Sequence, residues 1–376
     1  MKALAKSPLY DIPHQILKAA SKVGVEADES KRSATYFQID HSKVLAAVNE
    51  YYKGKVEVLS IVDAVKKYDW LKDYLWRLIP PDKDEYTHRV HSELGGGYFI
   101  RILPGVKVDL PLQACLVIAK EGFEQAVHNV IIAEEGSDAH IITGCTLHPH
   151  VNSSLHIGVS EFFVKRGAKL NFTMVHSWSQ GTVVKPRSAA LIEEGATFIS
   201  NYICLNPVKE VQAYPVAYVA GRRGIAVFNS ILYAARSSFM DIGSRVELVA
   251  PEARSEVTSR AVASSGSKVV ARGMLIASAS PVKAHLECKG LILDDDSSIH
   301  AIPELVGSKR DVDLSHEAAV GKLADHEIAY LMSRGLSRED AVSVLVRGFL
   351  NVELLGLPKE LADEINALIM RLAKGM

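Results

Sequence analysis

One turn type recurs at nearly even intervals along the middle of this 376-residue chain. It reads Glu-Glu-Gly-Ser at 134–137, Lys-Arg-Gly-Ala at 165–168, Glu-Glu-Gly-Ala at 193–196, Gly-Arg-Arg-Gly at 221–224 and Ala-Pro-Glu-Ala at 250–253. The third residues of these turns, at 136, 167, 195, 223 and 252, are separated by 31, 28, 28 and 29 residues. A sustained period of this size is typical of stacked repeats, in which each unit covers the apolar side of its neighbour.

The runs between the turns are short and rich in Val, Ile, Phe and Tyr. Tyr98–Leu103, His140–Ile142 and Leu170–Val175 are examples, and their composition predicts β-strands. A coil made only of strands and tight turns cannot bury its apolar side alone. The pattern therefore predicts a mainly β fold of the β-helix, or β-solenoid, type. A β-sandwich or barrel is the alternative, although its strands need not keep so even a spacing.

Both ends of the chain have helical patterns. Residues 1–90 are predicted to be a mainly helical region, in which Asp63–Trp76 places apolar residues on one helical face before two prolines at 80 and 81. After a β-helix core at 91–312, three amphipathic helices are expected in a C-terminal region at 313–376. Gly335 suits the end of the first of these helices, and Ser337 suits the start of the second. Because an open sheet edge templates aggregation, both helical regions are expected to cover the ends of the solenoid.

Composition and missing motifs exclude several classes of function. The formal net charge is −1, with 48% hydrophobic and 23% charged residues, so nothing favours binding to nucleic acid or to an anionic membrane. The first residues lack an apolar signal-peptide core and no apolar run is long enough to cross a bilayer, so a cytoplasmic protein is expected. Phosphate-loop, dinucleotide-binding and nucleophile-elbow motifs are missing, so this chain is not expected to bind or hydrolyse nucleotide.

The chain has four widely spaced cysteines with no Cys-x-x-Cys pair: Cys115, Cys145, Cys204 and Cys288. Their separations of 30, 59 and 84 residues are near one, two and three repeats, but the favoured interpretation of the first three is a small apolar core residue. Cys288 differs, because His300 and Glu304 follow within about half a coil and are expected to return close to it. A thiolate with imidazole and carboxylate suits iron or zinc. The alternative is a structural cysteine beside solvated histidines.

A second candidate metal site is the segment Thr146–His156, which holds His148, His150 and His156. Two imidazoles two residues apart on a strand or loop can share a metal ion. The favoured interpretation is nevertheless a polar loop whose histidines bond to backbone and water.

Four stretches together resemble the SufB/SufD family, the scaffold proteins of the Suf iron–sulfur cluster assembly system. They are Val108–Gln113, Leu155–Val164, Leu314–Lys322 and Tyr330–Ser337, and the resemblance extends from about Val56 to the C-terminus. It implies a right-handed parallel β-helix flanked by helical terminal regions, in agreement with the fold predicted from the repeats.

The resemblance also implies partners. An ABC-type ATPase similar to SufC is expected to dock on the C-terminal helical region at about 315–350 and to supply nucleotide hydrolysis, so this chain would be a scaffold and not an enzyme. The expected contact residues are Tyr330, Leu331, Met332, Arg334, Gly335 and Leu336. A dimer through the last coils, near 285–310, is expected either with itself or with a SufB-like chain.

One position departs from the family pattern. SufB carries an assembly cysteine a few residues before its Leu-x-His-Glu motif, and aligning that motif on Leu314–Glu317 puts Gly307 there. His316 matches the histidine that SufD contributes, so the chain resembles SufD or a minimal archaeal scaffold.

If the chain is a minimal scaffold, Cys288 is the expected replacement thiol. The predicted ligands of a transient [4Fe-4S] cluster are Cys288 and His316 with His300 or Glu304. The alternatives are a carbohydrate-active solenoid hydrolase or lyase, and a purely structural subunit of the assembly complex.

Overall fold

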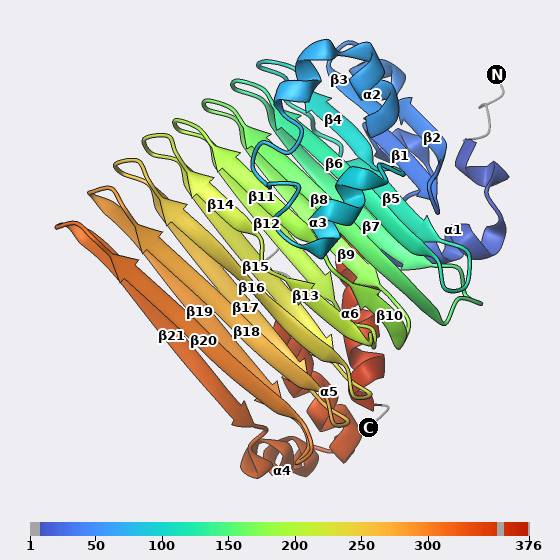
Figure 1. Cartoon of the computed structure of the whole chain (residues 1–376). Coiled ribbons are helices and arrows are strands. Elements are labelled where there is room, and N and C mark those ends of the chain that lie inside the picture. The colour runs from blue at the N-terminus through green and yellow to red at the C-terminus, as the bar shows by residue number, and fades with distance from the viewer. Residues whose placement is uncertain (1–7, 352–356, 375–376) are drawn as a thin grey trace.

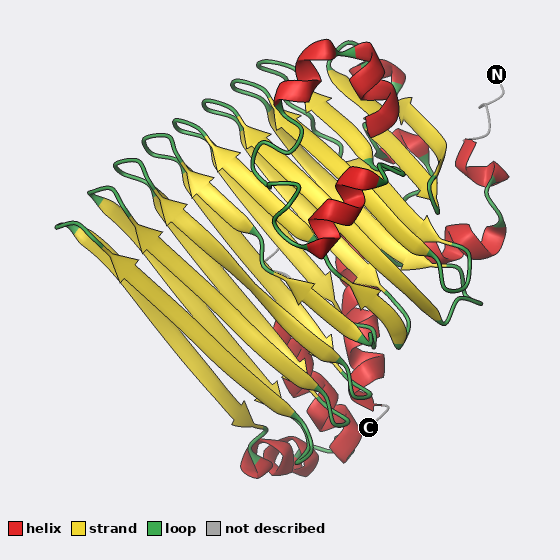
Figure 2. Cartoon of the chain, viewed as in Figure 1, coloured by secondary structure: helices red, strands yellow, loops and turns green. Residues whose placement is uncertain are grey.

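The computed structural model of the chain describes residues 8–351 and 357–374. Strands of two parallel sheets face each other across an apolar interior, coil upon coil (Figures 1 and 2). The first sheet contains, in spatial order, β2 (Ser42–Val48), β1 (Ala34–Ile39), β5 (Leu112–Ile118), β7 (Asp138–Leu147), β9 (Lys169–Ser177), β12 (Thr197–Cys204), β15 (Ile225–Ala234), β17 (Arg254–Ala263), β19 (Val282–Ile292) and β21 (Val312–Lys322). The second contains β3 (Val56–Ser60), β4 (Tyr98–Ile102), β6 (Glu124–Ala133), β8 (Ser153–Val164), β10 and β11 (Gly181–Val184, Arg187–Ile192), β13 and β14 (Glu210–Ala213, Val216–Val219), β16 (Phe239–Leu248), β18 (Lys268–Ala277) and β20 (Ser298–Gly307). The predicted mainly β solenoid is confirmed.

The repeated turn forms a ladder of hydrogen bonds between coils. All five third positions have φ angles between 60° and 67°: Gly136, Gly167, Gly195, Arg223 and Glu252. The backbone N–H of Gly136 donates to the Arg166 carbonyl oxygen at 2.9 Å, and the corresponding bond recurs at the other four turns. This left-handed conformation favours glycine. The even period of the sequence therefore reflects one backbone turn, which is kept even where arginine or glutamate replaces glycine.

Two prolines divide the middle of the second sheet. Pro186 lies between β10 and β11, and Pro215 lies between β13 and β14. Proline cannot donate a ladder hydrogen bond, so each of these strands is split into two short pieces. Both proline rings line an interior cavity that lies beside the candidate site described below.

Among its described residues the N-terminal region contains short helices, but it also supplies three strands. Its α-helices are α1 (His14–Ser21), α2 (Ile61–Lys67) and α3 (Glu85–Ser92), and its 3₁₀ helices are η1 (Pro8–Asp11), η2 (Glu29–Lys31), η3 (Glu50–Tyr52) and η4 (Asp69–Asp73). The β1–β2 hairpin extends the first sheet, and β3 pairs antiparallel with β4 of the second. The helix predicted over 63–76 is broken at Tyr68, where α2 gives way to η4. The solenoid therefore begins before residue 91.

The solenoid also ends later than predicted, because β21 continues to Lys322. Three helices follow: α4 (Asp325–Ser333), α5 (Arg338–Leu350) and α6 (Lys359–Lys374). Gly335 has a φ of +94° after α4, and the Ser337 hydroxyl accepts the Asp340 N–H at the start of α5, so both predicted caps are confirmed. Among the described residues, no helix is long and apolar enough to span a membrane.

The C-terminal helices pack on the outer face of the first sheet, behind the strands in Figure 1. Their apolar residues contact one side of six strands, from Ile142 of β7 to Leu291 of β19. The expectation that they cover the C-terminal end of the stack was wrong. Within the described part of the chain, β20 and β21 each pair on one side only, and they form the lower-left margin of the stack in Figure 1.

Candidate functional site

The predicted ligand Cys288 lies in β19 with its side chain in the solenoid interior. It is 1% exposed and stacks on Ser259 of β17. Burial raises the pKa of its thiol to about 11, and the negative charge of Glu287 contributes. The thiol is therefore protonated near neutral pH and would become a thiolate ligand only when a metal displaces its proton.

His316 lies on the last coil, on the same side as Cys288. It pairs in register with Leu286, whose side chain belongs to the interior, and Cys288 pairs with Ala318. His316 lies on the strand next to that of Cys288 and is offset from it by two residues along the strand. This places their Cα atoms about 8 Å apart. His316 is exposed, whereas Leu286 one coil earlier is fully buried.

His300 and Glu304 lie on the opposite sheet and face outward. Their neighbours Ile299 and Ala301 pack against the interior, so the alternating pattern of β20 directs His300 and Glu304 away from it. Among the described residues, the four predicted ligands do not bring three ligand atoms close enough together to share a metal ion. The ligand set therefore stays a prediction.

The predicted partner-binding residues divide into two kinds. Tyr330 and Met332 on α4 are 59% and 45% exposed, and the Arg334 guanidinium lies 5.3 Å from the centre of the Tyr330 ring. Leu331 and Leu336 are instead half-buried and pack with the C-terminal helices. Tyr330, Met332 and Arg334 thus have exposed side chains, and Gly335 is exposed as well.

The structure brings together a different group of potential metal ligands inside the solenoid. Cys145, His156 and His176 each offer one ligand atom, and these atoms all lie within 4.8 Å of one another. Cys145 and His176 are register partners on β7 and β9 of the first sheet, whereas His156 comes from β8 of the second sheet. All three side chains are at most 2% exposed. Among the described residues this is the one group of three or more such ligands.

Hydrogen bonds fix the orientation of His156. The Gln125 amide nitrogen donates to the Asp40 carbonyl at 2.7 Å, so the Gln125 Oε1 atom faces His156 Nδ1 at 2.9 Å. An oxygen acceptor at this position requires a proton on Nδ1. Nε2 of His156 therefore carries the lone pair, the form that binds metals.

His176 is held in a similar way by Tyr202. The Tyr202 hydroxyl lies 2.9 Å from His176 Nδ1 and forms a hydrogen bond with it. His176 Nε2 is buried with no hydrogen-bond partner. The Trp178 ring packs against both imidazoles, with ring centroids 5.1 Å and 5.2 Å away.

Burial sets the protonation of the group. It lowers the pKa of His156 to about 3 and lowers that of His176 well below its usual value, the positive charge of His156 adding to the effect on His176. It also raises the pKa of the Cys145 thiol. Both imidazoles are therefore neutral, and the thiol is protonated when no metal is present.

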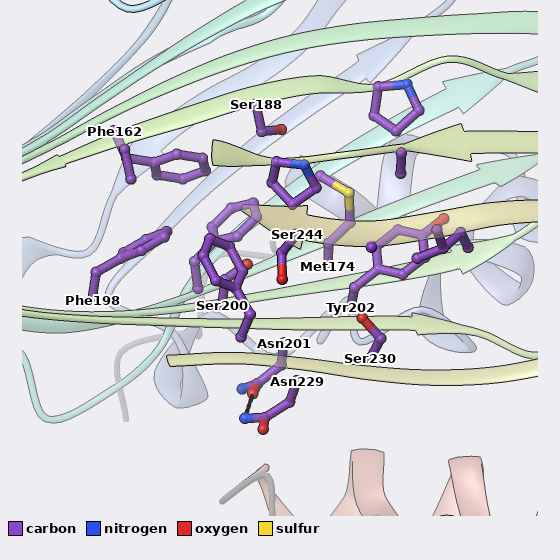
Figure 3. Close-up of a pocket in the computed structure, with 18 of the residues that line it drawn as sticks. Phe162, Met174, Ser188, Phe198, Ser200, Asn201, Tyr202, Asn229, Ser230 and Ser244 are labelled. Carbon is purple, nitrogen blue, oxygen red and sulfur yellow. Dashed lines mark hydrogen bonds between the residues drawn. The ribbon is translucent and has the colours of Figure 1, made fainter. Parts of the chain in front are cut away.

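An interior cavity of about 50 Å³ is lined by Tyr202, the hydrogen-bond partner of His176. Tyr202 lines one end of it, with Ser230 and Ser244 nearby, and Phe162 and Phe198 line the other end (Figure 3). A space of this size holds roughly three water molecules. The lining of this cavity is mainly apolar, with the hydroxyl groups of Tyr202, Ser230 and Ser244 among its few polar groups.

The other two histidines of the predicted second site lie apart from this group. His148 and His150 stack in a surface turn with ring centroids 4.1 Å apart, whereas His156 is buried. Cys115 packs under the N-terminal helix α1, as the core interpretation predicts. Cys145 and Cys204 are interior residues, but each lies beside polar groups that the sequence interpretation did not assign to them.

The sequence matches the family described as SUF system FeS cluster assembly, SufBD core domain, over residues 116–349. The chain belongs to the SufBD family. It is 52% identical over 348 residues to the iron-sulfur cluster assembly SufBD family protein of Archaeoglobus fulgidus, covering 93% of this chain and 92% of that protein. It is 29% identical over 366 residues to the iron-sulfur cluster assembly protein SufB of Bacillus subtilis, covering 96% of this chain and 78% of that protein. The predicted family is thereby confirmed.

Proposed function

We propose that this SufBD family protein is a scaffold on which an iron–sulfur cluster is assembled, at the open last coil, for delivery elsewhere. The observation that carries this proposal is the placement of Cys288 and His316 on adjacent strands at a coil that no described element covers. Thiolate is the preferred protein ligand of iron–sulfur clusters, and a mixed thiolate and imidazole set leaves a cluster easier to release. Family membership favours this function over a carbohydrate-active solenoid.

A second chain would complete the site. The strands β20 and β21 present an unpaired edge, with Val306 and Val320 44% and 42% exposed. Such an edge is a template for pairing with another chain, and two-fold pairing is the commonest symmetry. His300 and Glu304 face outward on this chain. In a shared cluster, either residue would therefore be contributed by the partner chain.

An ABC-type ATPase similar to SufC is the proposed second partner. The exposed anchors Tyr330, Met332 and Arg334 on and after α4 support docking there, since aromatic and arginine residues dominate interface energies. Nucleotide hydrolysis would belong to that partner, and this chain would act without catalysing a reaction itself.

Anaerobic reconstitution with iron and sulfide tests the assembly site. Wild-type protein should acquire a cluster with its visible absorbance, and Cys288→Ser should lose most of the bound iron and acid-labile sulfide. Cys115→Ser is the matched control, because Cys115 is equally buried at 1% exposure but packs beneath α1. Full cluster content in Cys288→Ser would reject the site, and no cluster in the wild-type chain with its partners present would favour the purely structural subunit.

A further inference from the structure

The buried group of Cys145, His156 and His176 lies far from the last coil and has no part in the site proposed there. Cys145 and Cys288 are both on the first sheet, on β7 and β19, with four strands between them. At the spacing of neighbouring strands, this separates the two thiols by about 24 Å along the stack. The interior group therefore needs its own explanation.

Packing alone does not account for these residues. A buried polar nitrogen without a partner costs on the order of 1–3 kcal/mol. His176 Nε2 is such an atom, and Trp178 Nε1 beside it is another. The interior of neighbouring coils is filled at equivalent positions by apolar residues, such as Leu116 before Cys145 and Leu232 after Cys204.

We infer that Cys145, His156 and His176 bind one divalent transition-metal ion of borderline softness, of the Zn²⁺ or Fe²⁺ type, inside the solenoid. One thiolate and two imidazoles are ligands that such ions prefer, and three protein ligands leave a fourth position open. In tetrahedral geometry the ligand atoms would be about 3.3–3.6 Å apart, so contraction by about 1 Å from the observed upper limit completes the site.

Two neighbours prepare the ligands. Gln125 and Tyr202 each bond to the Nδ1 side of one imidazole, which leaves Nε2 of each ring available to the metal. Such outer contacts typically change metal affinity by 10–100-fold. Binding releases the Cys145 S–H proton and the ion's displaced water ligands to solvent. No oxidation or reduction is involved.

Titration of the metal-free, full-length protein with Co²⁺ tests this inference. Wild-type protein should bind one equivalent and develop the near-ultraviolet thiolate-to-cobalt charge-transfer band with the visible bands of a tetrahedral site. Cys145→Ser should lose the charge-transfer band, and His176→Gln should bind at least about tenfold more weakly. Cys288→Ser and Cys115→Ser are the controls that should retain both signals.

A measurement on unmodified protein guards against misfolded variants. Zn²⁺ should protect Cys145 from alkylation in partly denaturing conditions, as mapped by peptide mass spectrometry, while Cys115 stays unprotected. Absence of a stoichiometric cobalt complex in wild-type protein would overturn the inference, as would loss of the band in Cys288→Ser with retention in Cys145→Ser. Because Cys288 decides the assembly experiment and Cys145 decides this one, either proposal can fail alone.

Discussion

The carboxylate of Glu161 should be the main attachment of the N-terminal segment between η4 and α3 to the solenoid. Glu161 is fully buried on the outer face of β8 and accepts backbone N–H groups of Trp76, Leu78 and Ile79 at 2.7, 2.6 and 3.3 Å. His128 Nε2 lies 2.8 Å from the same carboxylate. These contacts also hold Trp76 at a φ of +60°, a strained conformation for a bulky residue.

The magnitude follows from what Glu161→Ala leaves behind. Three backbone donors and one imidazole would lose their acceptor, at about 1–3 kcal/mol each if the segment stayed in place. Detachment of the segment limits this cost, so we expect a loss of about 4 kcal/mol, the lower end of the sum over these four groups. Glu161→Gln keeps one acceptor oxygen and should lose roughly half as much.

Chemical denaturation would measure the free energy of unfolding, and amide hydrogen exchange would report the segment directly. Protection of the amides at residues 76–79 should fall in Glu161→Ala before that of the solenoid strands. Glu135→Ala is the control, because the Glu135 ion pair with Arg166 is exposed and should contribute less than about 1 kcal/mol. A loss below 1 kcal/mol for Glu161→Ala, or unchanged exchange at 76–79, would refute the reasoning.

Three further results are expected. Arg334→Glu should weaken ATPase binding at least about tenfold by calorimetry, whereas Arg338→Glu on the adjoining helix should not. Equal affinities of the two variants for the ATPase would exclude α4 as the docking surface. Val320→Asp on the exposed face of β21 should abolish pairing of scaffold chains in light scattering, and an unchanged mass would place the interface elsewhere. Burial, aided by the positive charge of Arg32, lowers the pKa of His140 to about 4, so at this residue the unfolded chain binds more protons than the folded chain between pH 4 and 6.5. His140 alone should lower stability by on the order of 1.4 kcal/mol per pH unit as pH drops through this range, and His140→Gln should reduce the wild-type slope by about that amount.

The repeat period was sufficient to predict the solenoid, because one backbone turn must recur wherever coils stack in register. It also held an unused signal for the interior group. His176 lies 31 residues after Cys145 and 28 before Cys204, so the three were predictable as one column of the first sheet. His156 could not be added in this way, since a period along the chain does not reveal which residues of two facing sheets meet across the interior.

The helical ends show a similar limit. The 3.6-residue pattern located the C-terminal helices and their caps. An apolar helix face, however, indicates only that another part of the protein covers it, and not which part. Whether that surface is the end of a stack or the side of a sheet depends on side chains such as Ile142 and Leu291, which lie about 150 residues apart. The outward direction of His300 and Glu304 was accessible from strand alternation, once the register of β20 was known.

The packing of α6 along the first sheet couples the length of a helix to the number of coils. Leu361 near its start belongs to the same apolar cluster as Ile142 of β7, and the Leu372 carbonyl near its end accepts the Tyr233 hydroxyl of β15. The helical rise from Leu361 to Leu372 is about 16 Å, and the three strand spacings from β7 to β15 are about 14 Å. Inserting one coil of about 29 residues would therefore require only about three more residues in α6 to keep both ends in contact. A solenoid that gained a coil without this change would leave an apolar strip of the first sheet exposed, and one that lost a coil would leave an apolar part of the helix exposed. The length of α6 is therefore matched to the number of coils.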